Sequence, residues 1–496
     1  MALTTVDLDQ HGTLSSGFKV INDAVHGHIK LDLYSFDFID TVQFQRLRDL
    51  KQLGATYFVF PGGSNNRFEH SIGVSYLAGT LIERFQKDQP ELCITEDEIK
   101  CVKLAGLCHD LGHGPFSHVF DNQVMPKLRP GLSWSHEEAS EMMLEYLIDD
   151  NNIDIERNEI NLIKDLIAGT PRSRSQYDER CFLFDIVANK RNSVDVDKFD
   201  YIERDAQNLG LRSSYDAKRL LMYSRIVNNE ICYHHKEVYN LYEMFYTRYS
   251  LFKRIYTHRV AESIEMMITD AMIHADSSLG ISSAVDKPEE YLNLTDDILR
   301  VIERSKSDGL AKSRSIMRRL RTRDLYKFVD EFLLPTELES HINKHTITES
   351  EIISHQSTGD NLTEEDVIVK WIKINYAMKD RNPVDSIRFY SKFNDHESFT
   401  IPKQQVSYMI PQQFEEVIVR VFTRDPQKVT AIQKAFRRLL KRIVPIESNA
   451  EPNAALTLPN DYDDVVRLKR KHSGSLQPVD GNEVVKKWRQ GESSCE

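Results

Sequence analysis

A dense group of potential metal ligands and proton-transfer groups lies in the segment LAGLCHDLGHGPFSHVFD, at 104–121. Its histidines and aspartates are His109, Asp110, His113, His118 and Asp121. Imidazole nitrogen and carboxylate oxygen together suit a first-row divalent metal ion. Adjacent His and Asp side chains at the end of a helix can converge on one ion, and two glycines directly afterwards break that helix. A His-Asp dipeptide alone is common and carries no meaning, but this density of ligand types favours a metal site.

Two further segments complete a ligand set. RFEHSIGVSYLAG, at 67–79, places His70 at the start of an amphipathic helix, with Arg67 one turn earlier. NSVDVDKFDYIERD, at 192–205, is rich in charged and aromatic side chains, namely Asp195, Asp197, Lys198, Asp200, Tyr201 and Asp205. Taken separately, the first segment is typical of an ordinary helix terminus and the second of a solvated helix face.

The chain that must position these residues is expected to be mostly helical. Among 496 residues there are only 20 Gly and 16 Pro, so residues that interrupt helices are scarce. Apolar side chains recur at helical spacing over 238–275, which predicts the longest helical run. We expect 276–290 to be an exposed loop and 291–333 to resume helical structure.

The last part of the chain changes character. Residues 335–365 are polar and predict an excursion or linker. VIVKWIKINYA, SIRFYSKF and VIVRVF then alternate in the manner of strands, and Asp425-Pro426 opens a basic helix that runs to about residue 443. The sequence therefore predicts four parts: a flexible arm at 1–18, a helical domain with an extension at 19–333, a small α+β lobe at 334–445 and a disordered tail at 446–496.

Composition excludes several classes of protein. Lys and Arg number 64 and Asp and Glu 76, so the net charge of −12 argues against a DNA-packaging protein. Six cysteines without a CxxC pair fit a reducing compartment. The start of the chain has no secretory signal, and no apolar stretch is long enough for a membrane span. We expect an intracellular protein with no membrane partner. RLKRKH at 467–472 is a candidate nuclear import signal, which leaves nucleus and cytoplasm both open.

The order His70, then His109-Asp110, then Asp197 resembles the H…HD…D pattern of the HD-domain phosphohydrolases. The chain is most similar to their deoxynucleoside triphosphate triphosphohydrolases, and among these to the animal members that carry a SAM domain before the HD domain. Only 18 residues precede the similarity, so we expect no SAM domain. The similarity covers about 19–445. It rests on KVINDAVHGHI, IDTVQFQRLRDLKQLG, VFPGGSNNRFEHSIGVSYLAG, AGLCHDLGHGPFSHVFD, NKRNSVDVDKFDY, EVYNLYEMFYTRYSL and NPVDSIRFY.

The resemblance implies a helical HD core at 19–333 and a reaction that converts a dNTP to deoxynucleoside and inorganic triphosphate. It implies one divalent transition metal (Fe, Zn or Mn), with Mg on the nucleotide phosphates. The implied metal ligands are His70, His109, Asp110 and Asp197. The implied general acid is His118, which protonates the leaving 5′ oxygen. Its supporting residues are Asp121 and His136, and His113 is implied to contact phosphate.

The resemblance also implies how the substrate is held. The implied phosphate ligands are Arg67, Lys198 and Arg248, since guanidinium and ammonium groups suit phosphate oxygens. Gln52 and Asp205 are implied to bind the 3′-hydroxyl. Tyr256 is implied to fill the space of a 2′-hydroxyl and so to reject ribonucleotides, while Leu53 and Tyr201 pack against the sugar.

Finally, the resemblance implies regulation by nucleotides bound between the subunits of a homotetramer. One site takes GTP or dGTP, and its implied residues are Lys19, Asp40, Gln45, Arg48 and Arg323. The neighbouring site takes a dNTP, and its implied residues are Val20, Asn22, Val59, Arg219, Lys236, Asn240, Arg254, Arg259 and Arg381. His234 stands where the animal relatives have Arg, which weakens the second site or makes it sensitive to pH.

Two other functions stay open from the residues. One is an HD phosphohydrolase that acts on other nucleotides, against which the sugar-binding set argues. The other is a protein that binds single-stranded nucleic acid, against which the net charge and the complete ligand set argue. The sequence leaves open the identity of the metal, the base preference and the biological role, whether dNTP pool control, antiviral restriction or repair.

Overall fold

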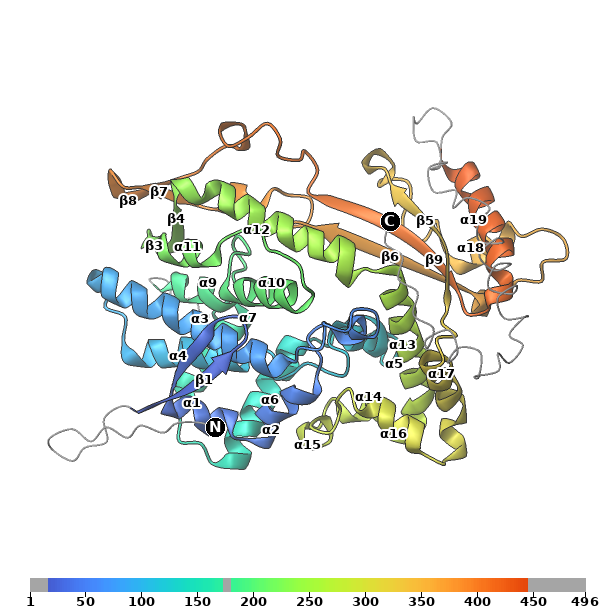
Figure 1. Ribbon diagram of the computed structural model, residues 1–496, viewed down its shortest axis with the longest axis horizontal. Coiled ribbons are helices and arrows are strands. Elements are labelled where there is room, and N and C mark those ends of the chain that lie inside the picture. The colour runs from blue at the N-terminus through green and yellow to red at the C-terminus, as the bar shows by residue number, and fades with distance from the viewer. Residues whose placement is uncertain (1–16, 173–179, 445–496) are drawn as a thin grey trace, which may run out of the picture.

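The computed structural model describes residues 17–172 and 180–444. Most of the expected arm at 1–18, the expected disordered tail at 446–496 and the RLKRKH motif lie outside the described residues. Between 17 and 280 the described chain forms a mostly helical body that also contains short antiparallel strands (Figure 1). Its helices are α1 (Leu33–Ile39), α2 (Val42–Gln45), α3 (Arg67–Asp88), α4 (Glu96–Cys108), α5 (Met125–Leu128), α6 (His136–Asn151), α7 (Arg157–Ala168), α9 (Phe184–Val187), α10 (Val196–Asn208), α11 (Ala217–Met222), α12 (Val238–Leu251) and α13 (Arg259–Leu279).

The helical body confirms the predicted fold class and places its core around α3. This helix is 22 residues long and begins with a capping box in which Asn66 and Glu69 satisfy each other's backbone N–H groups. Helix α4 begins with a similar box formed by Thr95 and Glu98. α3 packs along both α4 and α10, and the buried side chains of the three helices belong to one apolar cluster. The three helices therefore form a rigid frame around any site at their ends.

The helical run expected over 238–275 is two helices rather than one. α12 ends at Leu251, a π-helical turn covers Phe252–Tyr256, and α13 starts at Arg259. The His258 side chain caps α13 by accepting from the N–H of Val260. The apolar spacing continues through the junction, so periodicity alone could not reveal it. The widened turn carries Tyr256, and such π-bulges are frequent at functional sites.

Three expectations about connecting segments are wrong. Residues 276–290 are not a loop, because α13 continues to Leu279 and is followed by α14 (Ile281–Ala284) and α15 (Pro288–Tyr291), whose Ile281 and Tyr291 are fully buried. After α16 (Ile298–Arg304) and α17 (Ala311–Arg321), the expected helix gives way to strand β5 (Lys327–Leu334). The polar segment 335–365 is not a bare linker, because it contains α18 (Glu349–Ser354) and buries Ile342, Ile347 and Ile352 in the C-terminal core.

The C-terminal sheet has the order β5-β9-β6, all antiparallel, with β6 (Val367–Asn375) and β9 (Glu415–Thr423) at the positions expected for strands. Helix α19 (Val429–Ile443) packs against β5 and β9 and encloses a second apolar cluster (Figure 1). Since β5 pairs with β9, the boundary expected at 333/334 falls inside a strand. The division into domains stays a prediction.

The described chain contains two further sheets. β1 (Phe18–Asp23) and β2 (Gly27–Asp32) form an antiparallel hairpin that the sequence analysis did not foresee. The other sheet has the order β3-β4-β7-β8, formed by β3 (Ser224–Val227), β4 (Glu230–His234), β7 (Phe389–Ser391) and β8 (Asn394–Phe399). β4 and β7 are parallel and some 150 residues apart in the chain, so this sheet ties the C-terminal region to the helical body. Within the described ranges, every helix is too short or too polar to cross a bilayer.

Candidate active site

The site forms where the ends of α3, α4 and α10 meet. His70 lies in the first turn of α3, His109 caps the C-terminal end of α4, and Asp197 lies in the first turn of α10. The turn after α4 is held by the buried Ser140 of α6, whose hydroxyl donates to the carbonyl of His109 and accepts from the N–H of Gly112. A Cβ on Gly112 would lie 2.0 Å from the Ser140 nitrogen, so only glycine allows this close approach.

The structure brings the four expected metal ligands together. His70 Nε2 lies 3.1 Å from Asp197 Oδ1 and 3.5 Å from Asp110 Oδ2. His109 Nε2 lies 3.4 Å from Asp110 Oδ1 and 3.6 Å from Asp197 Oδ1. His70, His109 and Asp110 gather their ligand atoms within 4.8 Å of one another, and Asp197 lies beside both histidines, so the four supply the donor types that a first-row divalent metal accepts. We call these four residues the cage.

An unpartnered atom in the cage supports a cation there. His109 donates from Nδ1 to the carbonyl of Gly106, 2.8 Å away, and its Nε2 is buried without a hydrogen-bond partner. Buried polar atoms without partners are rare in folded proteins. Burial opposes the charged form of His70, but hydrogen bonds to Asp197 and Asp200 outweigh it and raise the pKa of His70 to about 10. Both observations show that the carboxylates favour positive charge at this point, and the residues therefore fit a divalent metal ion.

A second cluster adjoins the cage and consists of His113, His118, Asp121 and His136. His136 Nδ1 donates to Asp121 Oδ2 at 2.7 Å, and His118 Nδ1 lies 3.6 Å from the same oxygen. His113 stacks on His136 with ring centroids 3.9 Å apart, and its Nε2 lies 3.3 Å from Asp110 Oδ1. One carboxylate thus serves two imidazoles, while His113 joins this cluster to the cage.

The histidines of the second cluster differ in their pKa shifts and in their exposure to solvent. Burial, together with the nearby charges of Arg67 and His136, holds the pKa of His113 well below its ordinary value. Burial also disfavours the charged form of His136, but its hydrogen bond to Asp121 outweighs this and raises the pKa. The side chain of His118 is 65% exposed, whereas that of Asp121 is buried. His118 is therefore the member of the cluster that faces solvent and can meet a substrate.

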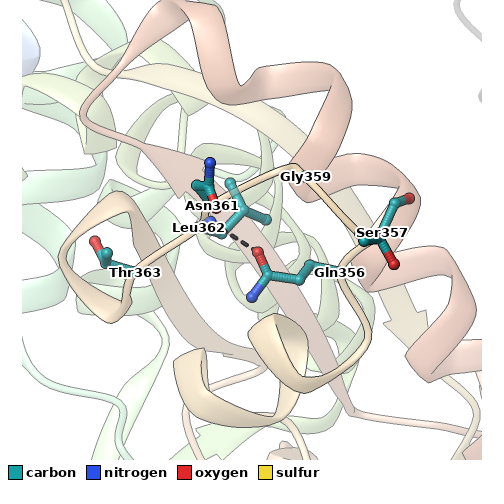
Figure 2. A pocket seen from close by; sticks show the side chains of 7 residues that line it. Gln356, Ser357, Gly359, Asn361, Leu362 and Thr363 are labelled. Atoms are coloured by element: carbon teal, nitrogen blue, oxygen red, sulfur yellow. Dashed lines mark hydrogen bonds between the residues drawn. The ribbon is translucent and has the colours of Figure 1, made fainter.

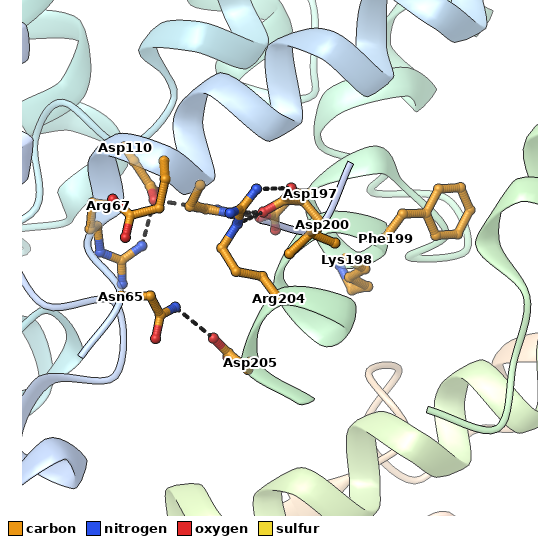
Figure 3. A network of polar contacts seen from close by, with 12 residues as sticks. Asn65, Arg67, Asp110, Asp197, Lys198, Phe199, Asp200, Arg204 and Asp205 are labelled. Carbon is orange, nitrogen blue, oxygen red and sulfur yellow. Dashed lines mark hydrogen bonds and ion pairs between the residues drawn. The ribbon is translucent and has the colours of Figure 1, made fainter. Parts of the chain in front are cut away.

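The three expected phosphate ligands already have partners. Arg67 is buried, donates from NH1 to Asp110 Oδ2 at 2.5 Å and from Nε to Ser117 Oγ at 2.9 Å. Lys198 Nζ lies 3.0 Å from Asp195 Oδ2. Arg248 donates to the Tyr201 hydroxyl and to the carbonyl of Asn375. Figure 3 shows Arg67 beside Asp110, and Lys198 near Asp197 on α10.

Among the expected sugar-binding residues, Asp205 lies near the C-terminal end of α10 and contacts Tyr256. The Tyr256 hydroxyl donates to Asp205 Oδ2 at 2.7 Å, and Asn65 donates from Nδ2 to Asp205 Oδ1 at 3.1 Å (Figure 3). Burial raises the pKa of Asp205 to about 6, although these two hydrogen bonds lower it. Gln52 Oε1 and Asn65 Oδ1 are buried without a hydrogen-bond partner, and Leu53 is half-buried. A polar ligand at this point would satisfy both oxygens.

Sequence reasoning missed three residues that hold the site. Asn65 lies in the segment GGSNNRFEH but carries no chemical signal of its own. Asp296 is half-buried, and its carboxylate accepts from the backbone N–H groups of Lys51 and Phe116 at 2.9 and 2.6 Å. It thereby fixes the loop in which Phe116 and Ser117 adopt left-handed backbone angles, with φ of 60° and 55°. Asp200 was recognised only as part of an acidic run, and its contacts appear only in three dimensions.

The residues expected to bind regulatory nucleotides lie apart from the cage, and several are paired within the chain. Lys19 Nζ lies 3.5 Å from Asp40 Oδ2, and Arg48 donates to Gln45 Oε1. Arg219 pairs with Glu237, to which Asn240 also donates, and Arg259 pairs with Glu331. Arg323 donates to the carbonyl of Phe58. The remaining residues of this set are exposed or half-buried, namely Val20, Asn22, Val59, Lys236, Arg254 and Arg381.

A pocket lies in the C-terminal region, in the segment after α18 (Figure 2). It is lined by Gln356, Ser357, Thr358, Gly359, Asn361, Leu362 and Thr363. The Gln356 side chain closes its loop by accepting from the N–H of Leu362. None of these side chains ionises near neutral pH, so this pocket offers no acid–base or metal chemistry.

Comparison with known proteins matches the geometry. The HD domain model matches residues 67–205, and the model described as an HD associated region matches 215–396. A Dictyostelium discoideum protein named deoxynucleoside triphosphate triphosphohydrolase SAMHD1 homolog is 49% identical over 453 residues, which is 91% of this chain and 85% of the relative. The SAMHD1 proteins of Bos taurus and Homo sapiens are each 42% identical, covering 83% and 82% of this chain and 76% and 70% of their own.

Proposed function

This chain belongs to the SAMHD1 family of HD-domain hydrolases, and we propose that it hydrolyses dNTPs to deoxynucleoside and inorganic triphosphate. The observation that carries the proposal is the contact between two clusters. The cage presents a divalent-metal donor set, and His113 links it to an acid–base cluster that ends in the solvent-facing His118. Hydrolysis of a phosphate ester needs both a cation and a proton donor close together.

The cage residues would hold one divalent transition metal, Fe, Zn or Mn. When bound, such an ion lowers the pKa of water and offsets phosphate charge. Asp110 takes part in two functions, since it belongs to the cage and also pairs with Arg67 and His113. Arg67 and His113 would therefore contact an α-phosphate bound beside the cage. Mg would accompany the remaining phosphates.

The second cluster would deliver a proton to the leaving 5′ oxygen. An alkoxide is a poor leaving group, so protonation in the transition state accelerates its departure. His118 is exposed enough to reach the ester, and Asp121 shares its carboxylate between His118 and His136. The Asp121 carboxylate lies 3.6 Å from His118 Nδ1 and would orient the ring toward the ester.

Deoxyribose selection would come from Tyr256 and its neighbours. Asp205 is held by two donors, and Gln52 Oε1 is left free to accept from a sugar hydroxyl. The Tyr256 ring is held by its hydrogen bond to Asp205 and by an edge contact with Phe252 at 4.9 Å. A fixed ring at C2′ excludes a ribose hydroxyl by steric clash. Leu53 and Tyr201 would pack against the apolar side of the sugar.

We further propose activation by GTP or dGTP together with a dNTP, through assembly of a homotetramer. The cationic side chains of the proposed regulatory sites face solvent. We propose that one chain supplies only part of each site. A nucleotide that bridges subunits stabilises the assembled form by mass action. In a single chain Arg219 and Arg259 pair with Glu237 and Glu331, so an incoming phosphate has to replace these carboxylates.

The test is incubation with each dNTP and Mg, with and without GTP, alongside sedimentation velocity with GTP and a non-hydrolysable dNTP. We expect triphosphate release from dNTPs, and a joint rise of mass and rate with GTP. Inorganic phosphate or no product would contradict the proposed reaction. A rate and mass that ignore GTP would contradict the regulation alone.

A further inference from the structure

The carboxylate of Asp200 is fully buried and receives four hydrogen bonds. His70 donates from Nδ1 to Oδ2 at 2.7 Å, and His26 donates from Nε2 to Oδ1 at 2.6 Å. Arg204 donates from Nε to Oδ2 at 2.8 Å and from NH2 to Oδ1 at 2.9 Å. Figure 3 shows the Arg204 guanidinium lying against Asp200, directly beside Asp197. These donors come from α3, from the β1–β2 turn and from α10 itself.

The absence of a side chain at Gly73 leaves space for the Asp200 carboxylate. A Cβ on Gly73 would lie 1.9 Å from Asp200 Oδ1 and 2.5 Å from Arg204 NH2. Gly73 is three residues after His70 on α3, so it lies on the same helix face. On α10, Asp197, Asp200 and Arg204 share one face for the same reason. The two helices therefore approach at a point where Asp197 belongs to the cage and Asp200 contacts the cage residue His70.

Asp200 determines which nitrogen of His70 faces the cage. Because Nδ1 donates to Asp200, Nε2 is the nitrogen that points toward Asp110 and Asp197, and it would bind a metal ion on losing its proton. His109 is oriented in the same sense by its Nδ1 donation to Gly106. Partners of this kind fix both tautomer and ring orientation of a metal-binding histidine.

The β1–β2 turn completes the arrangement. Asp23 accepts from Arg204 NH1 through Oδ2 at 2.9 Å, and its Oδ1 accepts from the N–H groups of Val25 and His26 at 2.8 Å each. The turn is thus held to α10 by both Asp23 and His26. The guanidinium of Arg204 lies between two carboxylates and is itself almost completely buried. Removal of one partner from such a buried set leaves an uncompensated charge.

We propose that Asp200 is a positioning residue for the cage, and that Asp23 and His26 of the hairpin hold it in place. Metal affinity then depends on a docked β1–β2 turn. The inference rests on the proposed metal site and deepens it. Strand β1 also carries Lys19, Val20 and Asn22, which we propose as regulatory residues. By thermodynamic linkage, metal binding and hairpin docking stabilise each other equally.

The test is titration of the metal-free full-length protein with Co²⁺, followed by its visible absorption, with no nucleotide present. Loss of such a partner typically weakens metal affinity roughly 10- to 100-fold. We expect that loss for Asp200→Asn and a smaller loss for His26→Phe, and we expect His26→Gln to restore affinity because the amide can donate to Asp200. The matched control is Glu262→Gln, which breaks a buried pair with Arg420 in another part of the molecule and should leave Co²⁺ affinity unchanged.

Wild-type Co²⁺ affinity in both Asp200→Asn and His26→Phe would overturn the inference. If Asp200→Asn does not fold, His26→Phe against His26→Gln decides, together with amide exchange of the wild type. Metal should slow exchange across the β1–β2 turn, and equal exchange with and without Co²⁺ would contradict the coupling. These readouts involve no turnover. A protein that binds Co²⁺ as described yet releases no triphosphate would contradict only the proposed function.

Discussion

The catalytic region contains buried polar atoms without hydrogen-bond partners, whereas several cations of the proposed regulatory region are exposed and paired. In the catalytic region, His109 Nε2, Gln52 Oε1 and Asn65 Oδ1 are buried without hydrogen-bond partners. In the regulatory region, Arg219 and Arg259 are at least one-third exposed and already paired with glutamates. A buried atom without a partner costs about 1–3 kcal/mol, whereas an exposed ion pair stabilises by at most about 1 kcal/mol. At these three atoms the catalytic region is thus prepared for ligands within one chain, whereas its phosphate cations Arg67, Lys198 and Arg248 are already paired, like those of the regulatory region.

The largest effect should follow from dismantling the cage. His109→Ala with Asp110→Ala removes half of the donors, so we expect turnover to fall by about 10³-fold or more. The loss of Asp110 also leaves Arg67 buried without its carboxylate. Asp197→Asn, at a less buried side chain, should give a similar loss in a better-folded protein. Normal dNTP hydrolysis by either variant would contradict the assignment of the cage.

A second change tests the burial of charge at the sugar end. Burial raises the pKa of Asp205 from 3.8 to about 6, so its ionisation disfavours the folded state. The penalty is absent below pH 4, grows between pH 4 and 6 and stays constant above, where it reaches about 3 kcal/mol at most. Asp205→Asn should therefore be more stable than the wild type at pH 8, and by a smaller margin at pH 5. The variant should also lose activity. Thermal unfolding of both proteins at the two pH values measures this, and an equal difference at both would rule out the buried charge.

The third change concerns sugar selectivity. Tyr256→Ala opens space at C2′, so we expect the preference for dATP over ATP to fall by roughly 10-fold. The matched control is Tyr249→Ala. Tyr249 precedes Tyr256 in the same helical run and stacks on Tyr376, so its loss should leave the preference for dATP unchanged. If the wild-type protein hydrolyses ATP as fast as dATP, Tyr256 has no role in selection.

The smallest effect should occur in the regulatory region. Glu237→Gln weakens the pair that occupies Arg219, in which the arginine is half-exposed and the carboxylate buried, so we expect activation to need roughly 2- to 5-fold less dNTP. Asp185→Asn changes a pair with Arg191 on the helical body, in which the arginine is likewise half-exposed and the carboxylate buried, and it serves as the control. Activation at a higher nucleotide concentration in Glu237→Gln would show that the carboxylate assists binding rather than competing with it.

The sequence predicts well what depends on spacing along a single helix. His70 in the first turn of α3, and the His109-Asp110 pair at the end of α4, are where the pattern places them. It could not predict Asp200, because its partners lie 130 and 174 residues away and its contact depends on the missing side chain at Gly73. Strand β5 was mistaken for helix because its pairing with β9, about 90 residues later, outweighs local propensity.

The most direct test of the proposed reaction is hydrolysis of a dNTP in ¹⁸O-labelled water, with mass spectrometry of the products. The cage, Arg67 and His113 surround one point, and His118 stands beside it as proton donor, so water should attack the α-phosphorus. The account predicts one ¹⁸O in inorganic triphosphate and none in the deoxynucleoside. Label in inorganic phosphate, or in a nucleoside that has gained the oxygen at its 5′ carbon, would contradict it.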